Sequence, residues 1–148
     1  MILEALHASA PPLQCLALDG CAMGERDERA RLALLSACTA FAGLRRLSVA
    51  GTGIPTDALC AVLALLAHNP SRPPLSLDCA RNRLGPSGGL RLAAVLRGAA
   101  SLECLEAADN ELGAHAVAAI AEALRGAPSL RSLGLARNIR SPPRRDSS

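Results

Sequence analysis

Five short segments of this chain share one arrangement of apolar and polar positions. Each has apolar residues at its first, fourth and sixth positions and a Cys, Thr or Asn at its ninth, which we name the marker position. The markers are 31, 30, 28 and 28 residues apart, and they are Cys21, Thr52, Asn82, Asn110 and Asn138. Recurrence at a nearly constant spacing indicates an internal repeat, in which each unit packs against its neighbours.

Within each segment, apolar residues at alternate positions predict a short strand with one face in the core. Between the segments the apolar spacing becomes helical, because Leu59, Val62, Leu63 and Leu66 lie on one face of a helix. The matching inward positions in the next two repeats are Leu92, Leu96, Ile120 and Leu124. Each repeat is therefore expected to be a strand, a loop and a helix, which makes the strands parallel.

The first interval is the longest and contains a charged segment, which predicts a helix running from residue 24 towards residue 42. Counting back from Thr52 places Leu34 and Cys38 on the inward side of this helix. Phe41, the one aromatic residue of the chain, is expected to fill the gap that the longer spacing creates.

This repeat length and pattern are those of a leucine-rich repeat. They predict an α/β solenoid of the ribonuclease-inhibitor-like class with 28–31-residue repeats, its parallel strands on the concave side and its helices on the convex side. The fourth-position leucines must then lie side by side: Leu16, Leu47, Leu77, Leu105 and Leu133.

The marker side chains are expected to form a structural ladder, because an Asn amide can pair with backbone groups of a neighbouring loop that would otherwise be buried without partners. Thr52 can replace part of this function with its hydroxyl, and Cys21 is a weaker hydrogen bonder.

The pattern divides the chain into three parts. Residues 1–12 resemble the helix of a partial preceding repeat, residues 13–139 hold the leucine-rich repeats, and residues 140–148 read as a disordered tail. Terminal repeats normally carry polar caps, and neither end has one. We therefore expect a piece of a longer solenoid or a truncated isoform; the alternative is a small free-standing domain with frayed ends.

Composition and charge exclude several classes of function. The net charge is +3, and the sequence lacks the clustered basic face and the aromatic residues that nucleic-acid binders use. The longest apolar run, residues 58–67, is too short to span a bilayer, and residues 1–10 make a poor signal peptide. A cytoplasmic location without direct membrane insertion is the expectation.

The six cysteines do not fit a disulfide framework. Cys15 and Cys104 would both face outward three repeats apart, roughly 14 Å at the usual strand spacing, whereas a disulfide needs Cα atoms within about 7 Å. Cys38, Cys60 and Cys79 fall at or near core positions. No cysteine or histidine spacing fits zinc, so we expect no metal and no cofactor.

One stretch of the sequence resembles a particular family of leucine-rich-repeat proteins. Residues 76–89, Ser-Leu-Asp-Cys-Ala-Arg-Asn-Arg-Leu-Gly-Pro-Ser-Gly-Gly, resemble the repeat domain of the CARMIL proteins, which link capping protein, Arp2/3 and myosin I. Residues 50–59 also resemble a Ser-Gly-Thr-type segment of that family. The resemblance extends over residues 13–138. It implies a parent protein that regulates actin capping protein, uncaps filaments and acts in filament organisation and cell migration at the lamellipodium.

In that family the repeats lie between an N-terminal membrane-binding domain and C-terminal regions for dimerisation and capping-protein binding. The resemblance thus implies a cytoskeleton-associated protein that reaches the inner face of the plasma membrane through its parent. No residue here matches the capping-protein interaction motif, so this segment would supply the scaffold.

The outward-facing strand residues are the candidate contact surface, since solenoids usually bind partners there. The candidates are Asp19, Arg46, Ser48, Ser76, Asp78 and Glu106. Asp78 and Glu106 lie on adjacent strands and could form a small acidic patch, although two solvated carboxylates are the simpler interpretation. No nucleophile or apolar cleft accompanies them, so we expect no catalytic residue and no enzyme.

Three functions fit a repeat of this length: a scaffold in a CARMIL-like actin regulator, a ribonuclease-inhibitor-like or immune-sensor domain that binds a protein on its concave face, and a GTPase activator or tropomodulin-like end binder. The second class favours aromatic and charged hot spots, which the outward positions lack. GTPase activators use a strongly charged rim, which is also missing. The first hypothesis is therefore preferred.

Overall fold

The computed structural model of the protein describes residues 13–24, 26–41 and 43–139. The expected partial helix at residues 1–12 and the expected disordered tail at residues 140–148 lie outside the described residues. Strands and helices alternate in the order β1 (Cys15–Ala17), α2 (Glu28–Ala40), β2 (Arg46–Ser48), α3 (Thr56–Ala67), β3 (Leu75–Asp78), α4 (Gly85–Leu96), β4 (Leu102–Glu106), α5 (Gly113–Leu124) and β5 (Ser132–Gly134).

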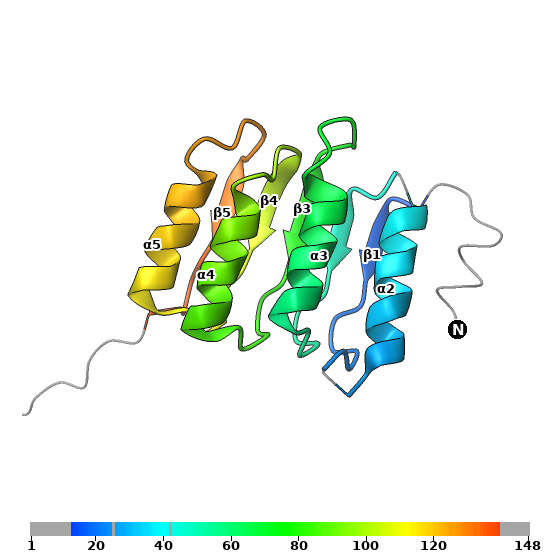
Figure 1. Ribbon diagram of the computed structural model, residues 1–148, viewed down its shortest axis with the longest axis horizontal. Helices are drawn as coiled ribbons and strands as arrows, with labels where there is room; N and C mark the ends of the chain where they lie inside the picture. The colour runs from blue at the N-terminus through cyan, green and yellow to red at the C-terminus, as the bar shows by residue number, and fades with distance from the viewer. Residues whose placement is uncertain (1–12, 25, 42, 140–148) are drawn as a thin grey trace, which may run out of the picture.

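The described residues form one parallel sheet of five strands in chain order, and the helices stand side by side in a layer against it (Figure 1). Leu16 pairs with Leu47, Leu47 with Leu77, Leu77 with Leu105, and Leu105 with Leu133. The predicted alignment of the fourth-position leucines is confirmed. Consecutive repeats therefore lie in register, each strand covering the apolar flank of the next.

The helices bury the face that their apolar spacing predicted. Leu59, Val62 and Leu63 of α3 have no exposed surface. The inward leucines and isoleucine of α4 and α5 are at most 4% exposed. Packing against the strands, more than intrinsic propensity, holds such short helices in place.

The helix of the first repeat is shorter than the sequence indicated. It begins at Glu28 and not at Gly24, and ahead of it the Asp27 N–H donates to the Gly24 carbonyl at 2.9 Å. Leu34 and Cys38 are buried as expected, and Phe41 joins the same core cluster. The helix thus takes up less of the longer first repeat than the sequence indicated.

Two adjacent glycines set the spacing of the C-terminal helices. A Cβ placed on Gly89 of α4 would lie 2.7 Å from the Cβ of Ala116 and 2.8 Å from Cδ2 of Leu112. On Gly88 it would lie 2.8 Å from Oγ1 of Thr56. The Ser-Gly-Gly segment therefore lets α4 approach both of its neighbours closely.

Candidate protein-interaction surface

The marker side chains form a hydrogen-bonded row beneath the loops that follow the strands. Oδ1 of Asn82, Asn110 and Asn138 accepts the backbone N–H of the preceding marker, at 3.0, 2.9 and 2.7 Å respectively. Asn110 Nδ2 donates to the carbonyls of Cys79 and Ala107, each at 3.0 Å. These side chains are buried, so the row fixes how the strand ends of neighbouring repeats sit against each other.

Cys21 departs from the ladder that the sequence suggested. Its residue is exposed, and its backbone N–H donates to the Leu18 carbonyl of its own loop at 3.0 Å. The Thr52 hydroxyl, which would face it, donates to the Val49 carbonyl and accepts the Ile54 N–H. The short Thr side chain satisfies its own loop and does not reach back, so the row ends at Thr52.

The loops around the markers use left-handed backbone conformations that sequence reasoning missed. In all five repeats of the described chain the residue before the marker has a positive φ. These residues are Gly20, Gly51, Arg81, Asp109 and Arg137. The residue after three of the markers does the same: Gly53, Arg83 and Glu111. The glycines at 20, 51 and 53 were the available signal, but charged residues replace them in the later repeats and conceal it.

The strand face is the side of the sheet opposite the helices. Two acidic candidates on it accept hydrogen bonds from backbone N–H groups two residues further along the chain. Asp78 Oδ1 accepts the Ala80 N–H at 3.0 Å, and Glu106 Oε1 accepts the Ala108 N–H at 3.0 Å. A Cβ at Gly134 would overlap the Glu106 carboxylate, so the glycine leaves room for that side chain over β5. Both carboxylates are half-buried and ordered by these contacts, which lowers the entropy lost when they bind a partner.

The other candidates occupy different parts of the same face. Arg46 is exposed on β2, and Ser76 is half-buried on β3. Ser48 is half-buried and its hydroxyl donates to the Asp19 carboxylate, which links the loop after β1 to β2.

A shallow hollow of about 230 Å³ brings five of the six candidates together on the strand face. Its lining includes Arg46, Ser48, Ser76, Asp78 and Glu106, with leucines of β2, β3 and β4 between them. Asp19 lies outside it. Cys104 and Ser132 also line the hollow; Cys104 was expected to face outward, but nothing in the spacing of either residue selected it as a site residue.

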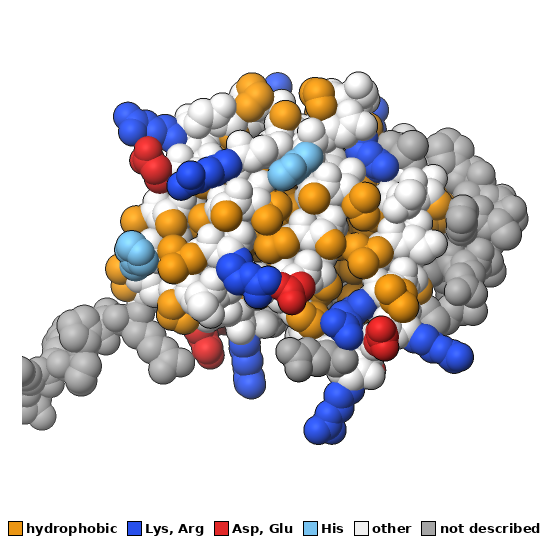
Figure 2. All heavy atoms as spheres, viewed as in Figure 1, with side chains coloured by type: hydrophobic (Ala, Val, Ile, Leu, Met, Phe, Trp, Pro, Cys, Tyr) orange, Lys and Arg blue, Asp and Glu red, His pale blue; other side chains and the backbone are white. Residues whose placement is uncertain are grey.

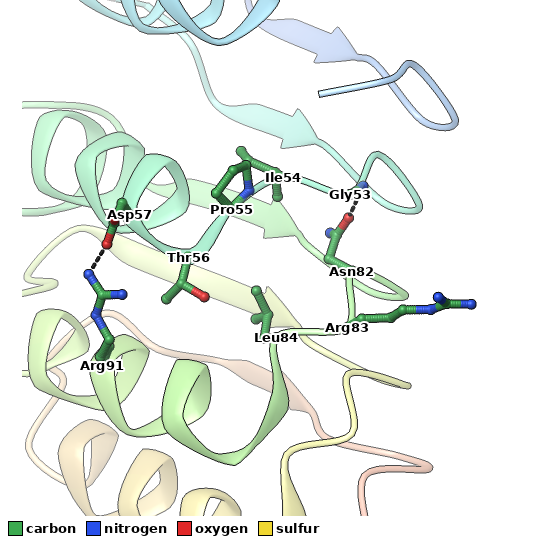
Figure 3. Close-up of a pocket in the computed structure, with 9 residues that line it drawn as sticks. All are labelled: Gly53, Ile54, Pro55, Thr56, Asp57, Asn82, Arg83, Leu84 and Arg91. Atoms are coloured by element: carbon green, nitrogen blue, oxygen red, sulfur yellow. Dashed lines mark hydrogen bonds and ion pairs between the residues drawn. The ribbon is translucent and has the colours of Figure 1, made fainter. Parts of the chain in front are cut away.

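A second hollow, of about 280 Å³, lies at the edge where α3 and α4 begin (Figure 3). Asp57 and Arg91 form an exposed ion pair across it, between the two helices. At its other side, Asn82 Oδ1 accepts the Gly53 N–H at 3.0 Å. These contacts fasten adjacent repeats together, so we interpret this hollow as a structural junction.

The helix side of the molecule is largely apolar at its centre. In Figure 2 hydrophobic side chains gather across the middle of the view, and most charged side chains lie towards the rims. Leu32, Leu65 and Leu90 are 58%, 37% and 40% exposed on α2, α3 and α4. The charged candidates Arg46, Asp78 and Glu106 lie on the opposite, strand side.

All six cysteines are free thiols. Burial raises the pKa of Cys38 to about 12, against a smaller opposing influence from Arg72. Burial also raises the pKa of Cys79 to about 12, and that of Cys60 to a smaller extent. Cys38 and Cys79 therefore pack as neutral apolar groups at ordinary pH. Within residues 13–24, 26–41 and 43–139, no three His, Cys, Asp or Glu side chains are grouped to hold a metal ion.

Membrane-spanning helices were also sought in the described part of the chain, and none of its helices has the length and apolar character to cross a bilayer.

Comparisons with known proteins identify relatives in fold only. No protein-family model matches the sequence, and no curated protein sequence matches it. Among solved structures, actin-binding site 2 of leiomodin-1 superposes with a TM-score of 0.71 at 18% identity, over 90% of this chain and 76% of that one. The tropomodulin C-terminal domain of Caenorhabditis elegans gives 0.63 at 17% identity, over 90% and 80%. The fold is accordingly an α/β fold of the leucine-rich-repeat type.

Proposed function

We propose that this chain is a protein-interaction segment of an actin-regulatory protein, and that it binds actin through the strand face. The observation that carries the proposal is the likeness in fold to a domain whose name is an actin-binding site, that of leiomodin-1, over 90% of this chain. In this proposal the repeats form part of a solenoid with the strand face as its concave side, and the role is binding without catalysis.

The chemistry of the strand face supports this use. The hollow places a guanidinium, Arg46, on the same surface as the carboxylates of Asp78 and Glu106. Charges of both signs give electrostatic complementarity, which contributes more to specificity and association rate than to raw affinity.

The comparisons change the order of the hypotheses drawn from the sequence. Likeness to a tropomodulin domain favours the tropomodulin-like alternative, which the sequence had placed behind the CARMIL-like one. Both describe actin regulation. The ribonuclease-inhibitor-like and immune-sensor alternative gains no support from the strand face, whose hollow has no aromatic residue in its lining.

The finer assignment rests on the resemblance of residues 50–59 and 76–89 to the CARMIL repeats. It would make the parent a regulator of capping protein in filament organisation and cell migration, cytoplasmic and recruited to the cytoskeleton and the plasma membrane. This segment contains no match to the capping-protein motif, so we expect it to bind actin and not capping protein. A pull-down that retains capping protein tightly on the isolated chain would contradict that expectation.

A titration of fluorescently labelled monomeric actin with the full chain tests the actin proposal. The double variant D78N/E106Q preserves the oxygen atoms that accept the Ala80 and Ala108 N–H groups but removes both charges. We expect it to weaken binding at least about tenfold, as the loss of central contacts commonly does. The control D57N/E122Q removes two exposed carboxylates from the helix layer and should leave affinity unchanged. Absence of saturable binding by the unaltered chain would refute the proposal.

A further inference from the structure

Arginines gather at one edge of the fold, where the loops lead from each helix to the next strand. Because the strands are parallel, all of these loops lie at the same edge, the upper one in Figure 1. We name this the basic edge. Its described charged side chains are six arginines and two glutamates, which leaves an excess of four positive charges; they are Arg45, Arg46, Arg72, Arg97, Arg125, Arg131, Glu103 and Glu122.

The rest of the described chain shows no such excess. Outside the basic edge, residues 13–24, 26–41 and 43–139 hold seven arginines and eight carboxylates. The arginines of the edge are spread from residue 45 to residue 131, so they form no run in the sequence. The linear pattern therefore indicated no basic face, whereas the fold brings these positive charges together.

Local structure accounts for only part of this charge. Arg97 and Arg125 follow the last residues of α4 and α5, where a positive charge interacts favourably with the helix dipole. Arg72 is half-buried, and its Nη1 donates to the Cys38 carbonyl near the end of α2 at 3.3 Å. The remaining three arginines lie at the starts of strands β2 and β5, and no helix dipole explains them.

Three of the arginines are available to a partner. Among the described residues no carboxylate forms an ion pair with Arg45, Arg46 or Arg97, and all three are exposed. The carboxylates of the two edge glutamates lie 3.6 and 4.0 Å from nitrogens of the other exposed arginines. A guanidinium presents a planar fork that pairs with a carboxylate through two hydrogen bonds. Carboxylates of a partner would therefore meet unpaired guanidinium groups here.

The arginines lie close enough together to act on one ligand. Neighbouring strands are about 4.8 Å apart, so the strand starts from β2 to β5 extend over about 14 Å. Screening by salt acts over about 10 Å at 0.1 M, so the fields of neighbouring repeats add. About four residues of an extended chain, at about 3.3 Å each, would cover that distance.

We infer that the basic edge binds an acidic segment of a partner protein, a run of Asp and Glu residues that lies across the strand starts. Charge complementarity carries this inference, and it contributes most to specificity and association rate. The inference does not rest on actin binding. Because Arg46 also lines the hollow on the strand face, the test below leaves that residue unchanged.

Other anionic ligands fit the basic edge less well. Single-stranded nucleic acids stack on aromatic side chains, and the one aromatic residue, Phe41, is 5% exposed. Attachment to an anionic bilayer combines charge with the burial of apolar side chains. The exposed large apolar side chains of the described chain lie on helices or after β5, and none lies in the loops of this edge: Leu32, Leu65, Leu90 and Ile139. An acidic protein segment requires neither feature.

Fluorescence anisotropy of labelled hexaglutamate, titrated with the full chain at about 50 mM salt, tests the inference. We expect saturable binding that weakens as salt is added. The double variant R45E/R97E should weaken it at least about tenfold, because two attractive contacts become repulsive. The control R81E/R83E changes the net charge equally at two exposed arginines of the opposite edge, and should alter affinity by about twofold or less.

The neutral variant R45Q/R97Q places no new carboxylate at the end of α4 and should have an intermediate affinity. No saturable binding, equal losses in R45E/R97E and R81E/R83E, or unchanged affinity in R45Q/R97Q would overturn the inference. Tighter binding of a thymidine hexanucleotide or of phosphatidylserine vesicles than of hexaglutamate would also overturn it, since either result would assign the edge to another class of ligand.

Discussion

Replacing Asn110 with Ala removes the centre of the marker row. The Asn82 N–H, whose residue is 6% exposed, loses its acceptor Oδ1 at 2.9 Å and is left buried without a partner. The Cys79 and Ala107 carbonyls each lose one donor but retain another, from Asn82 Nδ2 and Asn138 Nδ2, both at 2.8 Å. The damage is therefore concentrated on one backbone donor.

The expected loss of stability follows from the number of hydrogen bonds that the substitution removes. One orphaned buried N–H costs about 1–3 kcal/mol, and the two weakened carbonyl contacts add a smaller amount. We expect Asn110→Ala to lower the free energy of unfolding by about 2–4 kcal/mol. That is a large share of the roughly 5–15 kcal/mol of a typical domain.

The assay is urea unfolding followed by far-ultraviolet circular dichroism, with hydrogen exchange of the Asn82 amide as a local readout. Asn69→Ala is the matched control, because Asn69 is exposed and its Oδ1 serves only a turn, accepting the Ser71 N–H at 2.9 Å. It should change stability by about 0.5 kcal/mol or less, as surface substitutions usually do. Equal effects of the two substitutions would refute the idea that the marker row stabilises the fold.

Three further predictions concern the backbone, helix packing and the thiols. Gly51→Ala should lower the free energy of unfolding, measured in urea, by about 1–2 kcal/mol, because Ala is strained at a φ of 63°; crowding adds nothing, since no atom lies within 4 Å of the added Cβ. Gly126→Ala, which is equally uncrowded and has no positive φ, should be neutral or stabilising. Gly89→Ala should shift the urea midpoint downward, because overpacking against α5 at 2.7 Å outweighs the helix propensity of about 1 kcal/mol that Ala gains. Stability measured against pH should be maximal below about pH 9 and fall towards pH 12, since burial keeps the Cys38 and Cys79 thiols protonated in the folded chain while the unfolded chain ionises. Because the sequence has no Lys or Tyr, Ala variants of these two cysteines should flatten that decline, and an unchanged decline would contradict the assignment.

Much of the fold could be predicted from the sequence because one packing solution recurs. A leucine followed two positions later by a second apolar residue returns every 28–31 residues, so the register of Leu47 against Leu77 follows from the repeat itself. The start of α2 could not be predicted as well, because its charged residues are compatible with both a turn and a helix. Whether Cys21 joins the marker row depends on whether the Thr52 side chain reaches back to it, which is a matter of side-chain length in three dimensions; the Thr52 hydroxyl donates within its own loop, to the Val49 carbonyl.

The composition of the strand face could be predicted from the sequence in outline, but its detailed contacts could not. Alternation identified which residues face away from the helices, and five of the six named candidates meet in the hollow. The folding of Glu106 over Gly134 was hidden, because a glycine at a strand end reads as a turn signal and not as space for a neighbouring carboxylate.

Two native thiols permit the most direct test of binding through the strand face. Cys104 lines the hollow on that face, and Cys60 lies on helix α3, and both are half-buried. The rate of iodoacetamide modification of each can be followed by mass spectrometry with and without monomeric actin. The proposal predicts that actin slows modification of Cys104 and leaves Cys60 unchanged; protection of Cys60 alone, or of neither thiol at saturating actin, would contradict it.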